Sequence, residues 1–292
     1  MYNLLSLLTG VVIAVMIVIN GQLTLIYGMV LSTVIIHIVG TIFSYLLCRV
    51  TKNAIKLDFK IPKWIYIGGA VGVLTTVFNN FAFGKISMTS IVALGLFGQS
   101  VTSLLIDNFG LFGMKRYPMK KSSIVGIIFA SVGIMFMLDS SMGSALIAVI
   151  LSFFAGVTVV VSRTINARLS SHIGEVQTSF MNHVVGLVVS IMLILIFGIG
   201  NTSNIEISRN IFIYIGGLFG VATVLLSNIT VPKVPAFNLT LLIFIGQVFT
   251  GVVVDTIMKN DFAEATFVGG IIITIGILIN TIMDYISTKK QV

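Results

Sequence analysis

Two glutamines, Gln99 and Gln247, lie near the midpoints of two long apolar runs, 88–109 and 236–257. A primary amide offers two hydrogen-bond donors and an acceptor, which suits recognition of a polar organic solute. The alternative is an interhelical hydrogen bond that holds a helix bundle together, worth roughly 0.6–2 kcal/mol. Because both residues fall near the middle of the membrane, where transporter sites lie, we expect them to bind a substrate.

Two histidines, His37 and His183, lie inside apolar runs, and each is followed three residues later by a glycine, Gly40 or Gly186. An intramembrane histidine is a candidate for the substrate site or for carrying a coupling proton at physiological pH. The alternative is a neutral histidine that hydrogen-bonds a carbonyl group where two helices pack closely. The glycines favour this packing role.

One arginine, Arg163, lies within the apolar run 144–168. Its planar guanidinium group could capture a carboxylate or phosphate of a substrate. The alternatives are that it extends to the membrane surface or pairs with Asp107. Asp107 and Asp255 lie near the ends of apolar runs, where they are candidates for gating or proton coupling. Contacts at helix ends, for instance with Lys115 or Arg116, are the structural alternative.

Asn20 and Asn166 lie near the ends of the first and sixth apolar runs and could line the entrances to a site or cap helices. Catalytic and nucleotide-binding signatures are missing from the sequence: it has no Walker A loop, no His-Glu-x-x-His and no Gly-x-Ser-x-Gly. The single cysteine, Cys48, excludes an intrachain disulfide and a multi-cysteine metal site. We therefore expect neither an enzyme nor a metal or cofactor protein.

The elements that position these residues are expected to be membrane helices. The chain of 292 residues is 57% hydrophobic and only 9% charged, and a membrane-spanning helix needs about 20 mostly apolar residues. Ten such runs fill the chain and leave no room for a soluble domain: 4–25, 29–50, 63–84, 88–109, 121–138, 144–168, 174–198, 209–230, 236–257 and 264–286. Backbone groups in lipid must be hydrogen-bonded internally, so helices are expected.

Short motifs of the first half return in the second half, in the same order. The offset is 146 positions for the first two motifs and 148 for the others: Ile19–Leu23 and Ile165–Leu169, His37–Gly40 and His183–Gly186, Gly68–Gly72 and Gly216–Gly220, Phe97–Gln99 and Ile245–Gln247. The repeat predicts two five-helix units, 1–140 and 141–292. Because five is odd, the second unit is inverted relative to the first, as in many secondary transporters.

Basic residues indicate the orientation. With ten spans, thirteen of the seventeen Lys and Arg residues fall on the side of the termini and three on the other side. The positive-inside rule then places both termini in the cytoplasm. The net charge of +8 is thereby explained by topology and contact with lipid headgroups, and not by nucleic-acid binding.

The paired units, the Asn-Gly/Ala-x-Leu motif of the first helix, the Gly-Gly-x-x-Gly motif and the stretch Gly95–Gly110 resemble the drug/metabolite transporter superfamily, most closely its bacterial YdcZ-like family. The resemblance implies a bacterial inner-membrane protein of ten helices. Helices 1–4 and 6–9 would line a cavity, and helices 5 and 10 would be peripheral, with a homodimer contact there. Arg163 and Arg168 replace Ile17 and Gln22 of the first half, so the cavity is expected to be asymmetric.

These observations predict a secondary transporter of a small polar organic solute, anionic or zwitterionic, that works by alternating access and is driven by an ion gradient or by exchange. A proton-coupled exporter of hydrophobic or cationic compounds is a second hypothesis. A non-transporting membrane sensor or assembly factor is a third. A membrane enzyme acting on lipid-linked substrates would need a catalytic cluster at one interface, which the sequence does not contain.

Overall fold

The described part of the chain is helical and contains no strand. The computed structural model describes residues 1–52, 60–86, 88–119, 121–137, 145–198, 207–259 and 264–289, without the side chains of 88, 89, 121, 122, 255–259, 265, 266, 277, 280, 281 and 284–289. Its α-helices are α1 (Tyr2–Val50), α2 (Gly68–Ala82), α3 (Met88–Phe109), α4 (Lys121–Met137), α5 (Leu146–Ile173), α6 (Glu175–Phe197), α7 (Gly216–Thr230), α8 (Ala236–Lys259) and α9 (Glu264–Lys289). The short 3-10 helices η1 (Lys63–Ile67) and η4 (Ile211–Tyr214) lead into α2 and α7, and η2 (Leu111–Gly113) follows α3.

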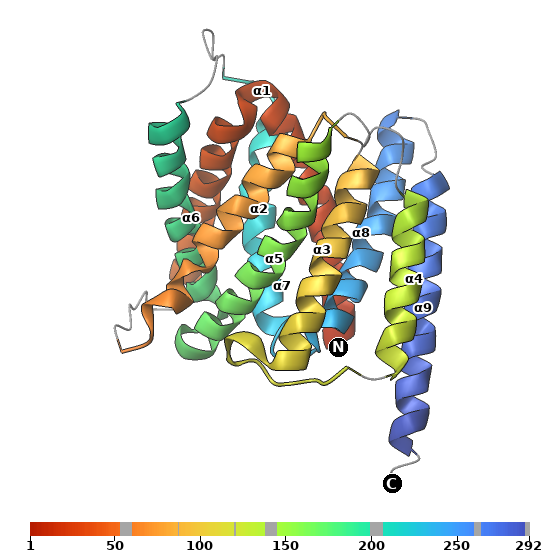
Figure 1. Cartoon of the computed structure of the whole chain (residues 1–292). Coiled ribbons are helices and arrows are strands. Elements are labelled where there is room, and N and C mark those ends of the chain that lie inside the picture. The colour runs from red at the N-terminus through yellow and green to blue at the C-terminus, as the bar shows by residue number, and fades with distance from the viewer. Residues whose placement is uncertain are drawn as a thin grey trace.

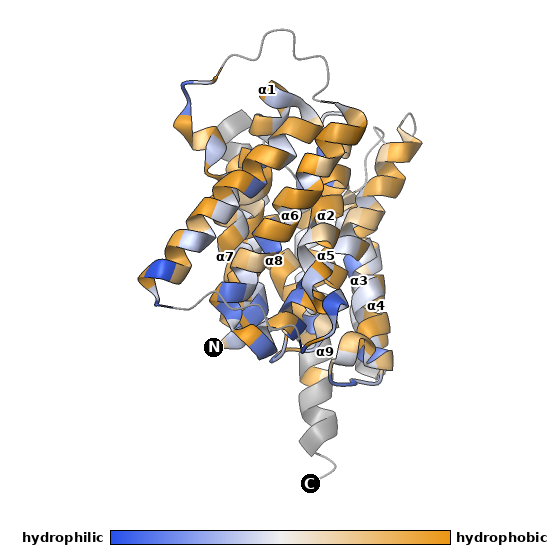
Figure 2. Ribbon diagram, turned by 90° about the vertical axis from the view of Figure 1, so that its left-hand side faces the viewer, coloured by the Kyte–Doolittle hydropathy of each residue, from blue (hydrophilic) through white to orange (hydrophobic). Residues whose placement is uncertain are grey.

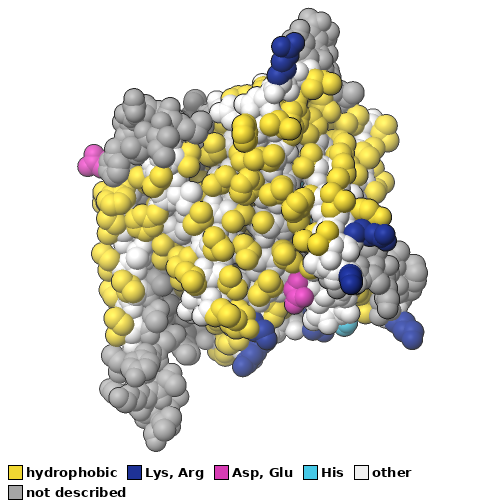
Figure 3. All heavy atoms as spheres, turned by 180° about the vertical axis from the view of Figure 1, so that it is seen from behind, with side chains coloured by type: hydrophobic (Ala, Val, Ile, Leu, Met, Phe, Trp, Pro, Cys, Tyr) yellow, Lys and Arg dark blue, Asp and Glu magenta, His cyan; other side chains and the backbone are white. Residues whose placement is uncertain are grey.

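The helices form a membrane bundle. Seven of those described are long and apolar enough to cross a bilayer, counting η1 with α2 and η4 with α7. The apolar described parts of α4 and α9 are shorter, Ser123–Met137 and Phe267–Gly276. Hydrophobic residues cover the middle of the bundle in Figure 2, and the face seen in Figure 3 is largely hydrophobic. Such a broad exposed apolar surface is expected of a protein surrounded by lipid.

Helix α1 is too long to cross a bilayer once. Its 49 residues would extend about 74 Å, more than twice the hydrocarbon thickness of about 30 Å. Gly28 interrupts the helix with φ 73° and ψ 172°, a conformation that glycine adopts without steric cost. The chain therefore turns back on itself at this residue (Figure 1). The interruption falls between the predicted runs 4–25 and 29–50.

Helices α4 and α9 lie side by side at one edge of the bundle (Figure 1) and pack on α3 and α8. They cross closely, because a Cβ atom added to Gly133 or Gly269 would meet the carbonyl oxygen of the other residue. Their outer faces expose apolar side chains, including Ile128 and Leu278. The peripheral position that the family resemblance implies for these two helices is thus confirmed.

The two halves of the chain make matching close contacts. A Cβ atom added to Gly10 of α1 would overlap the carbonyl oxygen of Ile243 in α8, and one added to Gly156 of α5 would overlap that of Gly95 in α3. Gly10 and Gly156 are 146 positions apart, and Gly95 and Ile243 are 148 apart. The crossing of α1 with α8 therefore corresponds to the crossing of α5 with α3, and the residues at the two crossings are related by the offsets found in the sequence. The predicted boundary at residue 140 lies outside the described residues.

Candidate functional site

A cavity lies between the two halves, with about 900 Å³ of empty space that is partly open to solvent. It is lined by residues of α2, α3, α5, α7, α8 and the first segment of α1. Most of the wall consists of residues related by the offsets of 146 or 148: Ile13 and Val159, Met16 and Ser162, Ile17 and Arg163, Thr75 and Thr223, Asn79 and Ser227, Gly95 and Ile243, and Gln99 and Gln247.

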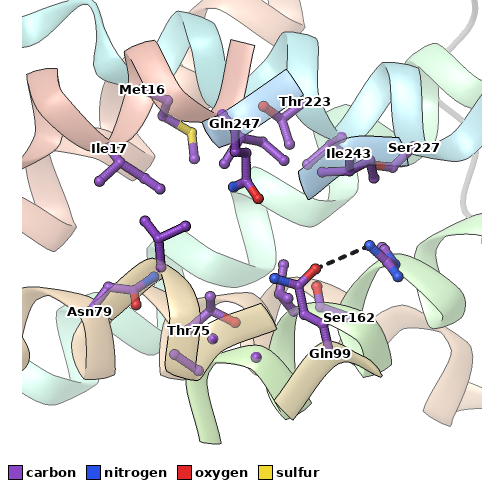
Figure 4. A pocket seen from close by; sticks show the side chains of 18 of the residues that line it. Met16, Ile17, Thr75, Asn79, Gln99, Ser162, Thr223, Ser227, Ile243 and Gln247 are labelled. Carbon is purple, nitrogen blue, oxygen red and sulfur yellow. Dashed lines mark hydrogen bonds between the residues drawn. The ribbon is translucent and has the colours of Figure 1, made fainter. Parts of the chain in front are cut away.

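The two predicted glutamines lie in this cavity. Gln99 projects from α3 and Gln247 from α8, on opposite walls (Figure 4). Gln247 is only 8% exposed, and Gln99 is partly exposed. The structure therefore brings together two amides that are far apart in the sequence, at a position where a bound solute could contact both.

Arg163 reaches the same cavity from α5 and is only 6% exposed. Its Nη1 donates to Gln99 Oε1 over a long 3.4 Å, shown by the dashed line in Figure 4, and its Nη2 donates to Ser103 Oγ at 3.3 Å and to Thr240 Oγ1. The two hydroxyls also hydrogen-bond to each other at 2.7 Å. All of these partners are neutral. Arg163 is therefore a buried cation that no carboxylate contacts within the described part of the chain.

Asp107, the nearest candidate counter-ion, attracts Arg163 only at a distance, because its carboxylate makes its direct contacts with another helix. Its two carboxylate oxygens accept the backbone N–H groups of Ala236 at 2.9 Å and Phe237 at 2.8 Å, and the residue is 7% exposed. A carboxylate at this position satisfies unpaired N–H groups and interacts favourably with the positive end of the helix dipole. Asp107 thus anchors the start of α8 to α3. Arg116 instead donates its Nε to the carbonyl oxygen of Asn108 at 2.7 Å. The side chain of Asp255 lies outside the described residues.

This contact leads to a prediction about stability. Asp107→Ala is expected to lower the free energy of unfolding by about 1–3 kcal/mol, because the first N–H groups of α8 lose their acceptors. Asp107→Asn, which keeps one acceptor oxygen, is expected to cost less. Thermal unfolding of the purified variants tests this, with Glu175→Gln at an exposed carboxylate as control. A stable Asp107→Asn protein that no longer transports would instead indicate a gating or coupling role.

His37 and His183 lie together but outside the cavity lining. Their ring centroids are 6.2 Å apart, and each Nδ1 is 2.8 Å from the carbonyl oxygen four residues earlier, Thr33 or Ser179. Since a carbonyl can only accept, Nδ1 carries the proton in both rings. Each ring also packs on the glycine that follows the other histidine, so that Gly40 and Gly186 leave room for His183 and His37.

The cavity lining takes no residue from 29–50 or from α6, unlike the lining by helices 2 and 7 that the family resemblance implies. Close contacts explain this difference. Gly69 of α2 packs on the backbone of Asn182 in α6, and Gly217 of α7 packs on the backbone of Ile36 in α1. The segments that carry the histidines are therefore held against α2 and α7, which themselves contribute to the wall.

The two predicted asparagines occupy different surroundings. Asn166 is part of the cavity wall and donates to Asn182 Oδ1 at 2.7 Å. Asn20 is not in the lining; it packs on Gly216, and its Oδ1 is buried without a hydrogen-bond partner in the described part of the chain. The offset of 146 thus relates two residues whose polar contacts differ.

Several polar lining residues were not predicted, chiefly Thr75, Asn79, Thr223 and Ser227. Each pair is spaced four residues apart on α2 or α7, and the second pair follows the first by 148 positions. A search for polar residues that share a helix face in both halves would have found them. Ser103 and Thr240, which hold Arg163, carry no comparable signal, because their counterparts are Gly251 and Val92.

Comparisons with known proteins agree with this architecture. The profile of a family described as "Putative inner membrane exporter, YdcZ" matches residues 1–136 and 147–279. A solved structure described only as "Crystal structure of protein" shares the fold, with a TM-score of 0.71 and 10% identity over 97% of this chain and 98% of that chain. No curated protein is similar enough to match. Because the family profile covers most of both halves, this protein belongs to the YdcZ family of inner membrane exporters, which are transporters and not enzymes.

Proposed function

We propose that this protein is a secondary transporter that carries a small organic anion or zwitterion through the central cavity. The observation that carries the proposal is the environment of Arg163, a cavity residue that is 6% exposed and whose hydrogen-bond partners among the described residues are all neutral side chains. A buried charge that no opposite charge contacts is costly, and in membrane proteins such residues mark substrate or ion pathways. An anionic substrate would supply the missing charge.

The neutral groups of the cavity suit the rest of such a solute. Gln99 and Gln247 offer amide donors and acceptors from opposite walls, and Thr75 and Thr223 add hydroxyl groups. Acceptor oxygens on these residues could bind the ammonium group of a zwitterion while Arg163 binds its carboxylate. A cation without an anionic group would face the positive charge of Arg163, which argues against export of simple hydrophobic cations.

The proposed architecture is ten spans in two inverted repeats, 1–140 and 141–292. Two interhelical glycines support it. Gly28, which divides α1, has φ 73° and ψ 172°, and Gly174, which separates α5 from α6, has φ 88° and ψ 159°. They are 146 positions apart, so the same backbone turn recurs at the repeat offset. Inverted repeats place a shared site near the membrane midplane and permit alternating access by rocking of the halves.

Differences in burial between the repeats indicate which side of the cavity is open. Met16, Ile17 and Asn79 are partly exposed, whereas their counterparts Ser162, Arg163 and Ser227 are buried. Tyr2 and Ile13 of α1 pack against a buried apolar cluster, which we infer closes the cavity on the side of the N-terminus: Ala167, Val231, Val234, Leu239 and Ile243. With both termini in the cytoplasm, we infer an outward-facing state.

Cysteine accessibility tests this state. In a variant whose buried Cys48 is replaced by serine, Asn79→Cys is expected to react with a membrane-impermeant thiol reagent added outside, because Asn79 is partly exposed. Ser227→Cys, its counterpart, is expected to react much more slowly, because Ser227 is 5% exposed. Labelling of cells before and after addition of a transported solute measures both rates. Faster labelling of residue 227 than of residue 79 from outside would contradict the outward-facing assignment.

A flux assay tests the function itself. Purified protein in liposomes is expected to exchange labelled organic monoanions or zwitterions faster than protein-free liposomes do, and a proton gradient or a counter-solute is expected to drive accumulation. In the cell the family description points to export as the direction. Movement of cations alone would favour the drug-export hypothesis. Binding without movement of any solute would favour a sensor.

A further inference from the structure

The polar corner around Arg163 has no polar counterpart in the other half of the protein. It contains Arg163 and its three hydrogen-bond partners Gln99, Ser103 and Thr240. The offsets of 146 and 148 relate these four residues to Ile17, Gln247, Gly251 and Val92. One position keeps its amide, but the cation and both hydroxyls are replaced by apolar residues. The pseudo-symmetry of the cavity is therefore broken in polarity.

The apolar counterpart belongs to the same cavity. Ile17 and Val92 both line it, and Ile13 and Met16 extend the apolar surface along one face of α1. Residues three and four positions apart share a helix face, so Ile13, Met16 and Ile17 form a continuous stripe. In Figure 4, Met16 and Ile17 lie across the cavity from Gln99 and Ser162. The cavity thus has a cationic, hydrogen-bonding corner at Arg163, and the opposite wall carries an apolar stripe of α1 beside Gln247.

We propose that the substrate is an amphipathic organic monoanion, with its charged group against Arg163, Ser103 and Thr240 and its hydrocarbon part against the apolar stripe of α1. The single positive charge of Arg163, which no carboxylate contacts in the described part of the chain, matches one negative charge. A second negative charge on the solute would itself be buried without a partner, which is unfavourable. The inference rests on the proposed binding of a substrate in this cavity and specifies its chemical class.

A homologous series of carboxylates tests the class. In lipid nanodiscs, straight-chain carboxylates from acetate to octanoate are expected to bind with an affinity that rises about fourfold per methylene until the apolar wall is covered, as hydrophobic transfer predicts. Alkylamines of the same length are expected not to bind, because the cavity is cationic. Dicarboxylates of the same length are expected to bind more weakly. Titration calorimetry on the full-length protein measures each dissociation constant.

Conservative variants distinguish binding of the hydrocarbon chain to this apolar surface from its nonspecific partition into lipid. Val92→Thr copies the Thr240 hydroxyl into the apolar wall, and Ile17→Thr makes a similar change on α1. Both are expected to reduce the gain per methylene to about twofold or less. Ile42→Thr is the control, because Ile42 is 57% exposed on the outside of α1 and should keep the wild-type gain. An equal gain in all four proteins would overturn the proposal, since the hydrocarbon would then be binding elsewhere.

The results show separately whether the proposed ligand class or the proposed transport function is wrong. Suppose that affinity rises with chain length and that the Val92 and Ile17 variants reduce this gain, but that the protein in liposomes transports none of the carboxylates. The ligand class then stands and the transport proposal fails. If liposomes move short polar anions or dicarboxylates regardless of chain length, transport stands and the amphipathic class is overturned. If the alkylamines bind as tightly as the carboxylates, the orientation by Arg163 is overturned.

Discussion

Arg163→Gln is expected to weaken organic-anion binding by at least about 30-fold, which corresponds to about 2 kcal/mol, because truncating one partner of a buried charge pair typically costs 2–5 kcal/mol. The same loss is expected in the rate of flux through liposomes at low substrate concentration. Arg163→Lys keeps the charge but not the planar fork and is expected to be intermediate. Arg168→Gln, five positions later on α5 and outside the cavity lining, is the matched control.

The stability of the same variant separates a substrate role from a structural one. Without ligand, the hydrogen-bond partners of Arg163 among the described residues are neutral, so removing its charge also removes a desolvation penalty. We therefore expect the unfolding temperature of Arg163→Gln to match or exceed that of the wild type, while stabilisation by added anion is lost. A lower unfolding temperature with unchanged anion binding would show instead that Arg163 holds α3, α5 and α8 together.

Gly156→Ala is expected to lower the free energy of unfolding by about 1–3 kcal/mol or more, as overpacking typically does. The added Cβ would overlap the carbonyl oxygen of Gly95 and approach the backbone nitrogen of Gln99. Backbone atoms cannot rotate away as a side chain can, so α3 and α5 must separate. Because Gln99 moves with α3, anion binding is expected to weaken as well.

Gly10→Ala is expected to have a similar effect, since its Cβ would overlap the carbonyl oxygen of Ile243 in the corresponding crossing of α1 and α8. Gly251→Ala on α8 is the control, because no atom of the described residues lies within 4 Å of its added Cβ and alanine favours a helix over glycine. Thermal unfolding in detergent compares the three variants. Equal stability of Gly10→Ala, Gly156→Ala and Gly251→Ala would show that these crossings are not tightly packed.

The histidines illustrate how far local patterns extend. Each histidine with a glycine three residues later predicted close packing, and the structure shows each ring against the other's glycine. The sequence could not show that the two rings approach each other or that they lie outside the cavity. The positions of the rings depend on which helix each glycine faces. Contacts between residues about 146 positions apart determine this.

For Asp107, the sequence predicted the kind of contact but not the partner. Its place near the end of an apolar run predicted a helix-end contact, and nearby Lys115 and Arg116 were the obvious partners. Its carboxylate instead accepts the N–H groups of Ala236 and Phe237, about 130 residues away. The partner is the beginning of another helix. Its free N–H groups belong to the backbone, so no charged side chain in the sequence marks them as a partner of a carboxylate.

The sequence alone determined that this is a helical membrane protein with a repeated motif order, because hydropathy and offset are properties of the chain itself. It also identified Gln99, Gln247 and Arg163, since polar groups in long apolar runs are costly and therefore rare. Only the tertiary structure decided that these three share one cavity, that the carboxylate of Asp107 binds the start of α8 instead of contacting Arg163, and that an apolar stripe of α1 lines the same cavity. Each of these facts depends on how helices from different halves pack against one another, and that packing is set by backbone approach at small residues rather than by any local pattern.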